Sequence, residues 1–165
     1  MAQSRGKQFE SIIREAFASV HGVSIDRLLD PMAGYAGVRN ICDFIVYKYP
    51  YEYYIECKTV HGNTLPFSNI TENQWQGLLA KSEIGGVFAG VICWWVDHDE
   101  TLWLDIRLLE QLRRLGYKSV NYYASWVEED IEHVQDLWTR LKANKKRVFF
   151  EYDMKSFLEE VGRDV

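Results

Sequence analysis

The stretch ICDFIVYKYPYEYYIECKT, residues 41–59, is the most informative part of the chain. It is rich in Ile, Val, Tyr and Phe, which predicts two β-strands joined by a tight turn at Tyr49-Pro50. Side chains alternate between the two faces of a strand, so Glu56 and Lys58 share a face of the second strand. Asp43 interrupts the otherwise apolar first strand. Ionised groups in such apolar strands are costly unless they are paired or coordinated. Two carboxylates and an ammonium group across one hairpin therefore predict a site for a hard metal ion, with a lysine beside it.

Taken alone, the motif Glu56-Cys57-Lys58 is weak, because Glu-x-Lys occurs by chance in most proteins and usually forms a surface ion pair. Its context favours a site. Asp43 precedes it by one hairpin length, both strands are apolar, and an amphipathic helix that bears Glu10 comes first. Glu10 itself has two interpretations. It can point along the packing face toward the sheet, or it can be a carboxylate near the helix start that interacts favourably with the helix dipole.

The chemistry of phosphodiester hydrolysis fits these residues. The reaction needs an in-line water, neutralisation of negative charge in the transition state, and help for the leaving oxygen. The carboxylates of Asp43 and Glu56, with the carbonyl of Cys57 between Glu56 and Lys58, suit oxygen coordination of Mg²⁺. The chain shows no cluster of thiols or imidazoles, which favours Mg²⁺, with Mn²⁺ as a substitute, over zinc.

The remaining candidate catalytic groups lie near this pair. Lys58 would orient the attacking water and help to deprotonate it, or would stabilise charge in the transition state. Gln74 or Glu10 would bind a metal-held water or a second ion.

The composition is that of a packed globular protein. Hydrophobic residues make up 47% of the 165 residues and aromatic residues 15%, which argues against disorder and allows a substantial core. The chain has no repeats, low-complexity segment or linker, so residues 1–165 are predicted to form a single domain. No apolar run is long enough to span a membrane, and the N-terminus lacks the apolar core of a secretion signal. Three cysteines in apolar runs are predicted to be small buried residues in a reducing compartment: Cys42, Cys57 and Cys93.

The net charge of −5 and the pI of about 5.4 count against a protein whose whole surface binds DNA, because phosphate binding depends on Lys and Arg. A local basic cleft is still compatible with this charge, since acidic metal ligands contribute to the negative total. The strongest candidate for a patch that binds DNA phosphates is Lys145-Lys146-Arg147, three consecutive cations in a predicted turn. The other candidates for DNA contact, each by default a solubilising charge, are Arg5, Lys7, Arg39, Lys81 and Lys118.

Helix and strand patterns alternate along the chain, which indicates an α/β domain. Residues 87–96 are continuously apolar and predict a central strand buried on both faces. Residues 61–69 are expected to form a loop by composition, and residues 144–147 a turn. Further strands are predicted over 101–104, 118–123 and 148–152. Helices are predicted over 7–21, from the Thr71–Gln74 capping box to Gly85, and over 106–115, 128–141 and 153–161, with Ser4, Asp105 and Asp153 as further caps.

The order of helix, two strands with Asp43 and Glu56-Cys57-Lys58, loop, helix and buried strand resembles the core of the restriction-endonuclease-like fold. The three charged residues resemble the signature of the PD-(D/E)xK nucleases. Within that superfamily the chain is most similar to Holliday junction resolvases of the RecU type. The residues that carry this likeness after the Glu-x-Lys are Thr64, Pro66-Phe67, Asn69-Ile70 and Gln74, followed by the strand 87–95 and by Gly116-Tyr117-Lys118-Ser119. The basic N-terminal extension of longer RecU proteins is absent.

The resemblance implies a mixed central β-sheet flanked by helices, and a Mg²⁺-dependent endonuclease that cuts four-way DNA junctions by paired nicks in recombination and repair. It adds Thr64 to the candidates for DNA contact. It also implies a cytoplasmic location in a bacterial or phage-infected cell, without a membrane partner. Two alternatives stay open. The substrate can be linear or flapped DNA, as in restriction and repair, or the chain can be an idle DNA- or protein-binding module. The intact set of Asp43, Glu56 and Lys58 speaks against an idle module.

A four-way junction has two-fold symmetry and needs two matched nicks, so a resolvase is expected to be a homodimer with two sites. Large aromatic side chains can supply the interface, although core packing explains them equally well. The tryptophans in question are Trp94, Trp95, Trp103 and Trp126.

Overall fold

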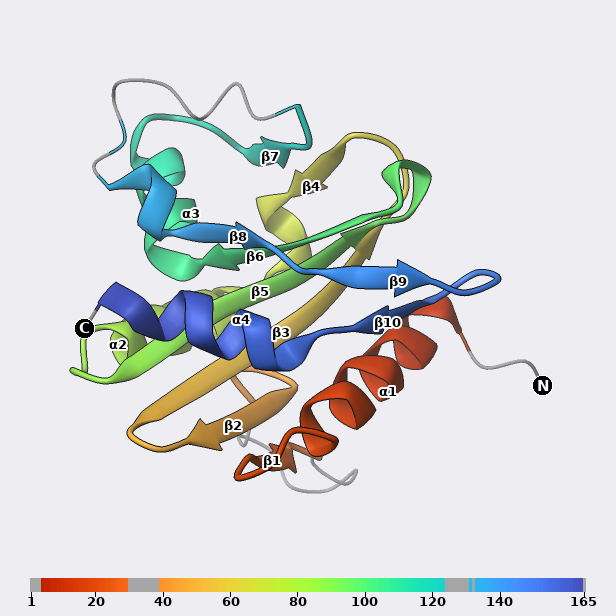
Figure 1. Ribbon diagram of the computed structural model, residues 1–165. Coiled ribbons are helices and arrows are strands. Elements are labelled where there is room, and N and C mark those ends of the chain that lie inside the picture. The colour runs from red at the N-terminus through yellow and green to blue at the C-terminus, as the bar shows by residue number, and fades with distance from the viewer. Residues whose placement is uncertain (1–3, 30–38, 124–130, 132, 165) are drawn as a thin grey trace.

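The computed structural model describes residues 4–29, 39–123, 131 and 133–164. Its centre is a six-stranded mixed sheet with the order β1-β2-β3-β5-β6-β8 (Figure 1). The pair β3–β5 is parallel, and the other neighbouring pairs of this sheet are antiparallel. The strands are β1 (Ser24–Arg27), β2 (Phe44–Lys48), β3 (Tyr51–Val60), β5 (Val87–Trp95), β6 (Glu100–Asp105) and β8 (Trp138–Arg140).

Two small antiparallel sheets and four α-helices complete the described elements. One small sheet pairs β4 (Thr64–Pro66) with β7 (Ser119–Asn121), and the other pairs β9 (Ala143–Lys145) with β10 (Phe150–Tyr152). The helices are α1 (Arg5–Ala18), α2 (Glu72–Ser82), α3 (Ile106–Arg114) and α4 (Met154–Val161), with the short 3-10 helices η1 (Phe67–Asn69), η2 (Val96–His98), η3 (Val134–Asp136) and η4 (Gly162–Asp164). None of the helices among the described residues is both long and apolar enough to cross a bilayer.

The helices form layers on both faces of the central sheet, as predicted. On one face α1 and α4 bury Phe9, Phe17 and Phe157, and on the other α2 and α3 bury Trp75 and Leu109 (Figure 1). The strand β5 lies between these layers and is buried on both faces, which confirms the prediction for residues 87–96. The fold class predicted from the sequence, a mixed central sheet flanked by helices, is confirmed.

The predicted helix caps are confirmed. Ser4 accepts a hydrogen bond from Lys7 N–H, and Thr71 and Gln74 form a complete capping box at the start of α2. Asp105 and Asp153 cap α3 and α4. These caps depend on side chains within three residues of the helix start, so the local sequence is sufficient to predict them.

The helix predicted over residues 128–141 is wrong where the structure describes it; residues 128–130 and 132 lie outside the described part. The segment forms η3 and then β8, which pairs with β6 from Leu102 to Leu104. Hydrogen bonds from Asp105 N–H to the carbonyl of Leu137 and from Leu141 N–H to the carbonyl of Thr101 continue this pairing. The free edge of β6 thus gains a partner strand, a contact between distant residues that overrides the helical spacing of apolar residues.

Two loop and turn boundaries also differ from the prediction. The predicted loop 61–69 contains β4, because its residues pair with β7, which is far away in the sequence. The basic turn lies two residues later than predicted, because Asn144 and Lys145 belong to β9 and the returning strand begins only at Phe150.

The tryptophans are core residues. Trp94, Trp95 and Trp103 are no more than 1% exposed, so they cannot form an interface with a second chain. Trp126 lies outside the described residues. The three cysteines are free and buried, as predicted.

Candidate active site

A β-bulge at the start of β2 places the carboxylate of Asp43. Phe44 lies opposite Ile55 in the hairpin, yet the N–H of Asp43 also donates to the carbonyl of Ile55 at 3.0 Å. Two residues of one strand thus oppose a single residue of the other, an arrangement that redirects a side chain. The Asp43 side chain turns toward β3 and accepts a hydrogen bond from Cys57 N–H at 2.8 Å. Its carboxylate therefore lies just before the start of β2, where β3 continues with β5 as its partner but no longer with β2.

Glu56 is the most deeply buried charged side chain of the site, with an exposed fraction of 4%. Its Oε1 accepts hydrogen bonds from Lys58 Nζ at 2.9 Å and from Gln74 Nε2 at 3.0 Å. Its Oε2 is buried and has no hydrogen-bond donor among the described residues. A buried carboxylate oxygen without a donor is costly, so this atom is the strongest indication that the site binds a positively charged group.

The electrostatics of the two carboxylates agree with this. Burial raises the pKa of Asp43, against the opposing effects of Cys57 N–H, Lys58 and Arg27. Burial and then the charge of Asp43 raise the pKa of Glu56 to about 7, although Lys58 and Gln74 act to lower it. A nearby cation lowers the pKa of a carboxyl group. A divalent cation would therefore stabilise both carboxylates in their ionised form.

The oxygen atoms at the site fit Mg²⁺. The described residues include no cluster of three or more His, Cys, Asp and Glu side chains that could hold a metal ion. An ion would therefore use the carboxylates of Asp43 and Glu56 with the main-chain carbonyl of Cys57. The N–H and C=O of one strand residue point to the same side, so the Cys57 carbonyl faces the space before the start of β2, as the Cys57 N–H does. Mg²⁺ takes one or two carboxylates in this way and completes its shell with water and substrate. The Cys57 thiol is not a suitable ligand, because burial raises its pKa well above the usual range.

The buried pair gives a prediction for the metal-free protein. Because the pKa of Glu56 is raised in the folded state, the native protein binds more protons than the unfolded chain between about pH 4.5 and pH 7. The free energy of unfolding should fall as the pH rises through this window, by on the order of 2 kcal/mol. Thermal melts in EDTA should show that Glu56→Gln lacks this decline and is more stable than the parent at pH 8.

The comparison between the two proteins isolates Glu56 from other titrating groups. Mg²⁺ should raise the melting temperature of the parent at pH 8 and have little effect on Glu56→Gln. If the stability of both proteins changes in parallel from pH 5 to pH 8, the raised pKa of Glu56 is contradicted.

Gln74 connects Glu56 to the start of α2. Its Oε1 accepts from Thr71 N–H at 3.0 Å while its Nε2 donates to Glu56. Since the amide is held at both ends, the capping box that starts α2 also fixes the orientation of the Glu56 carboxylate. The structure therefore places Gln74 beside the site, as a hydrogen-bond partner of a candidate metal ligand.

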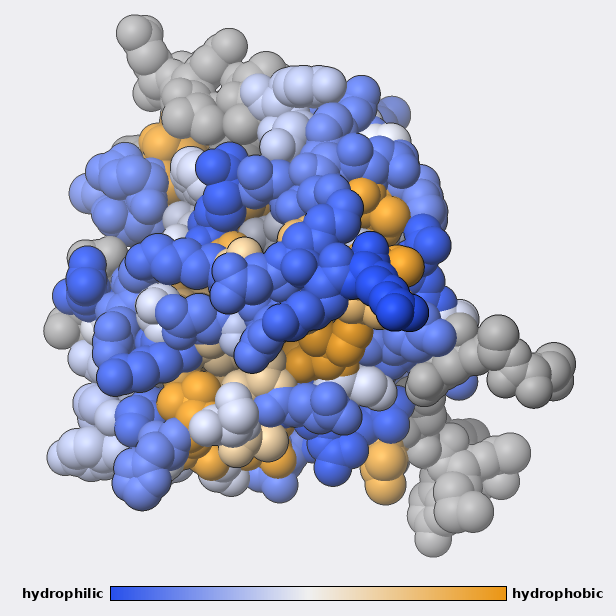
Figure 2. Space-filling model, turned by 45° about the vertical axis from the view of Figure 1, so that its right-hand side comes forward, coloured by the Kyte–Doolittle hydropathy of each residue, from blue (hydrophilic) through white to orange (hydrophobic). Residues whose placement is uncertain are grey.

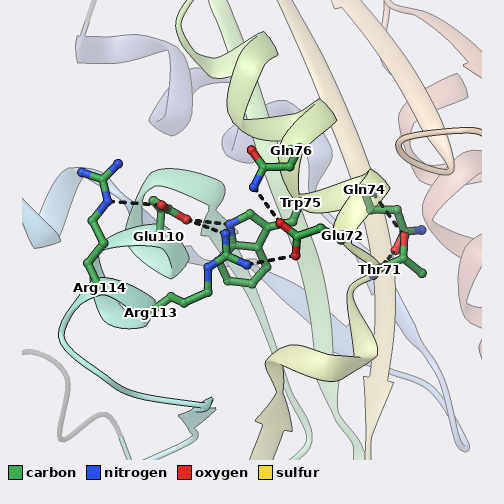
Figure 3. Close-up of polar contacts among 8 residues, drawn as sticks. All are labelled: Thr71, Glu72, Gln74, Trp75, Gln76, Glu110, Arg113 and Arg114. Carbon is green, nitrogen blue, oxygen red and sulfur yellow. Dashed lines mark hydrogen bonds and ion pairs between the residues drawn. The ribbon is translucent and has the colours of Figure 1, made fainter.

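A set of contacts between α2 and α3 holds this helix start in place (Figure 3). Trp75 Nε1 donates to Glu110 at 2.6 Å, and the guanidinium of Arg113 lies over the Trp75 ring at 4.0 Å from its centroid. Arg113 also pairs with Glu72 at 3.2 Å. Trp75 itself is only 1% exposed, so these contacts anchor the residue that follows Gln74.

Glu10 forms an ion pair with Arg27 of β1 at 3.5 Å. Its neighbour Phe9 packs in the same core cluster as Cys57, on the face of the sheet that α1 covers. Arg27 pairs with Phe44, the residue that follows Asp43, and its charge lowers the pKa of Asp43. Arg27 is not among the site residues predicted from the sequence, because only the pairing of β1 with β2 brings it to the site.

The structure gathers Asp43, Glu56, Cys57, Lys58 and Gln74 at one point, but distributes the candidates for DNA contact over several elements. Arg5 and Lys7 are exposed on the first turn of α1, beside the end of β3: a Cβ on Gly6 would lie 3.9 Å from Thr59 Oγ1. The hairpin of β9 and β10 lies against α1 and brings its basic turn to the same side (Figure 1).

In that hairpin Lys145, the last residue of β9, pairs with Asp99; in the turn that follows, Lys146 pairs with Glu151 at 2.9 Å and Arg147 is exposed. The other candidates lie on separate segments. Lys81 of α2 is over the Tyr54 ring, Thr64 begins β4, Arg39 is exposed before the hairpin, and Lys118 is exposed before β7.

No family model matches the chain, and no curated protein matches it. Among solved structures, the chain is similar to Hjc of Archaeoglobus fulgidus, a Holliday junction resolvase from an archaeal hyperthermophile, with a TM-score of 0.42 and 15% sequence identity. The match covers 62% of the present chain and 74% of the archaeal chain. A likeness of this extent assigns neither activity nor substrate to the present chain.

Proposed function

We propose that the protein is a Mg²⁺-dependent, structure-selective DNA endonuclease that cuts four-way junctions by paired nicks during recombination. The observation that carries the proposal is the buried Oε2 of Glu56, which lacks a hydrogen-bond donor among the described residues and lies in a site with Asp43 and Lys58. An ion pair with a purely structural role would not need a buried carboxylate oxygen that lacks a hydrogen-bond donor. A buried carboxylate with a raised pKa destabilises the fold in its ionised form, and a cation offsets this cost.

Each residue has a defined task in this proposal. Asp43, Glu56 and the Cys57 carbonyl would hold Mg²⁺, which when bound neutralises charge on the scissile phosphate and polarises the attacking water. The N–H of Cys57 orients the Asp43 carboxylate, and Gln74 orients that of Glu56. Lys58 is 22% exposed, so its ammonium group can reach both Glu56 and a phosphate oxygen in solvent. It would orient the water and stabilise the negative charge that develops in the transition state.

The distribution of basic groups supports DNA as the polymer that is cut. Arg5 and Lys7 lie at the start of α1, on the same side as the basic turn of the β9–β10 hairpin. Lys145 and Lys146 are partly neutralised by carboxylates, so Arg147 is the strongest single candidate of that turn for a phosphate. Such separate contacts suit a bent or branched DNA, whose arms leave the cleavage point in different directions.

The substrate is tested by comparing two DNAs of matched sequence. A mobile four-way junction and a linear duplex, both end-labelled, are incubated with the protein and Mg²⁺ and analysed on denaturing gels. We expect symmetric nicks near the branch point and much slower cleavage of the duplex. Equal rates on both substrates would assign the chain to linear or flapped DNA, and no cleavage of either would contradict the nuclease proposal.

Paired nicks at a symmetric junction require two sites, so we expect a homodimer. Sedimentation at micromolar concentration should give about twice the mass of one chain. The buried tryptophans do not contribute, and the face seen in Figure 2 is mostly hydrophilic with separate apolar patches, so an interface on that face would be largely polar. A monomer that still makes paired nicks would contradict this expectation.

A further inference from the structure

Three exposed or half-buried aromatic rings gather beyond the ends of β3 and β5. The rings of His98 and Tyr122 are stacked, with centroids 3.8 Å apart and an angle of 13° between their planes. Tyr123 stands nearly perpendicular to both, with its centroid 5.5 Å from each. The Tyr123 side chain is 70% exposed. We call these three residues the aromatic platform.

Hydrogen bonds hold the platform in position. His98 Nε2 lies 2.6 Å from Asn63 Oδ1, and Tyr122 N–H donates to the carbonyl of Asn63 at 2.7 Å. Tyr123 N–H donates to Asn121 Oδ1 at 3.0 Å. Three segments that are distant in the sequence thus converge on rings that remain open to solvent. Rigid, exposed aromatic rings with polar edges are typical of binding surfaces, since they offer a large contact area at low entropic cost.

The platform lies at the same end of the sheet as the candidate active site. Lys58 lies two residues before β3 ends at Val60, and the loop that follows carries Asn63. In the parallel neighbour β5, Trp95 lies opposite Val60, and His98 follows three residues later. Two strand residues at about 3.3 Å each and the three residues of η2 at about 2 Å each place His98 on the order of 13 Å from Lys58. This distance corresponds to only a few nucleotides of DNA.

The charges around the platform favour contact with a base over contact with a phosphate. Asp97 accepts a hydrogen bond from Gly62 N–H and pairs with His61 at 3.6 Å, and Asp99 pairs with Lys145. Carboxylates next to the rings repel the phosphate backbone. Stacking on the ring faces is available to every base, because each base has a π-face.

We propose that the aromatic platform stacks an unpaired nucleobase of the DNA substrate close to the point of cleavage. In a continuous duplex both faces of an interior base are covered by its neighbours. At a branch point or a bulge a face becomes open, so the platform adds affinity for interrupted DNA and none for a continuous duplex. The inference rests on the proposed nuclease function and names the residues that would make the nuclease selective for DNA structure.

The test uses a four-way junction with one unpaired 2-aminopurine at its centre, together with a linear duplex as the reference DNA. Binding is followed in EDTA, where no cleavage is expected, by the fluorescence of 2-aminopurine, which stacking quenches. The full-length parent should quench the fluorescence. Tyr123→Ala should lose most of the quenching and bind the junction roughly fivefold or more weakly, with unchanged affinity for the duplex. Tyr123→Phe keeps the ring and should behave as the parent.

A matched control is Tyr49→Ala, which removes another exposed tyrosine, at the turn between β2 and β3. It should leave both quenching and affinity unchanged. Circular dichroism should first show that Tyr123→Ala and His98→Ala are folded. If both variants then quench the fluorescence and bind the junction like the parent, while the parent nicks junctions, the platform proposal is overturned and the nuclease proposal stands. If the parent binds neither DNA, both proposals are overturned.

Discussion

Asp43→Asn and Glu56→Gln are each expected to lower the single-turnover rate of junction cleavage by roughly a thousandfold or more. The two carboxylates supply the anionic oxygens that would hold Mg²⁺, and the charge stabilisation that the ion provides amounts to several kcal/mol. Asn and Gln keep the shape of the side chains but remove the charge. Rates are measured with protein in excess over labelled junction, so that product release does not limit the result.

Folding and junction binding should survive both substitutions. Loss of one carboxylate relieves the repulsion between Asp43 and Glu56 in the metal-free protein, so Asp43→Asn should be at least as stable as the parent in EDTA. Glu159→Gln, which changes an exposed carboxylate on α4, is the control and should cleave at the parent rate. A large loss of thermal stability in Asp43→Asn would instead assign Asp43 to the fold, through its hydrogen bond to Cys57.

Lys58→Ala is expected to lower the single-turnover rate by roughly a hundredfold or more, on the scale of losing one transition-state donor. Its ammonium group lies 2.9 Å from Glu56 Oε1 and 22% of the side chain is exposed, so it can contact the reacting phosphate. An interaction made mainly in the transition state affects the rate much more than the affinity. Junction affinity should change only a few fold, because one cation is a small share of a phosphate footprint.

The control for Lys58 is Lys155→Ala, which removes an exposed lysine from α4. It should cleave at the parent rate. If Lys58→Ala also cleaves at the parent rate, then Glu56-Cys57-Lys58 is a strand ion pair and the nuclease proposal loses its main support. If the affinity falls but the single-turnover rate at saturating protein does not, Lys58 binds the DNA ground state and has no special role in the transition state.

The sequence was sufficient for features that depend on neighbouring residues. The hairpin around Pro50, the caps at Ser4, Thr71 and Asp105, and the buried strand β5 follow from patterns only a few residues long. The convergence of Glu56 with Asp43 also follows from one hairpin, since its two strands are consecutive.

Features that depend on distant pairing could not be predicted in this way. The apolar spacing around residues 138–140 predicts a helix, whereas these residues form β8, whose partner strand β6 lies more than 30 residues earlier. The position of Arg27 depends on the pairing of β1 with β2, and the orientation of Asp43 depends on a bulge that has no clear sequence signal. Trp94 and Trp103 could equally have been interface residues until their burial was known.

The central claim is that Asp43 and Glu56 hold a divalent cation that cleavage requires. The most direct measurement is the single-turnover nicking rate of the parent on a four-way junction in excess EDTA, followed by titration with Mg²⁺ and, separately, with Mn²⁺. The account predicts no cleavage in EDTA and a saturable recovery with either ion, absent from Glu56→Gln. Full activity of the parent in excess EDTA would contradict the account.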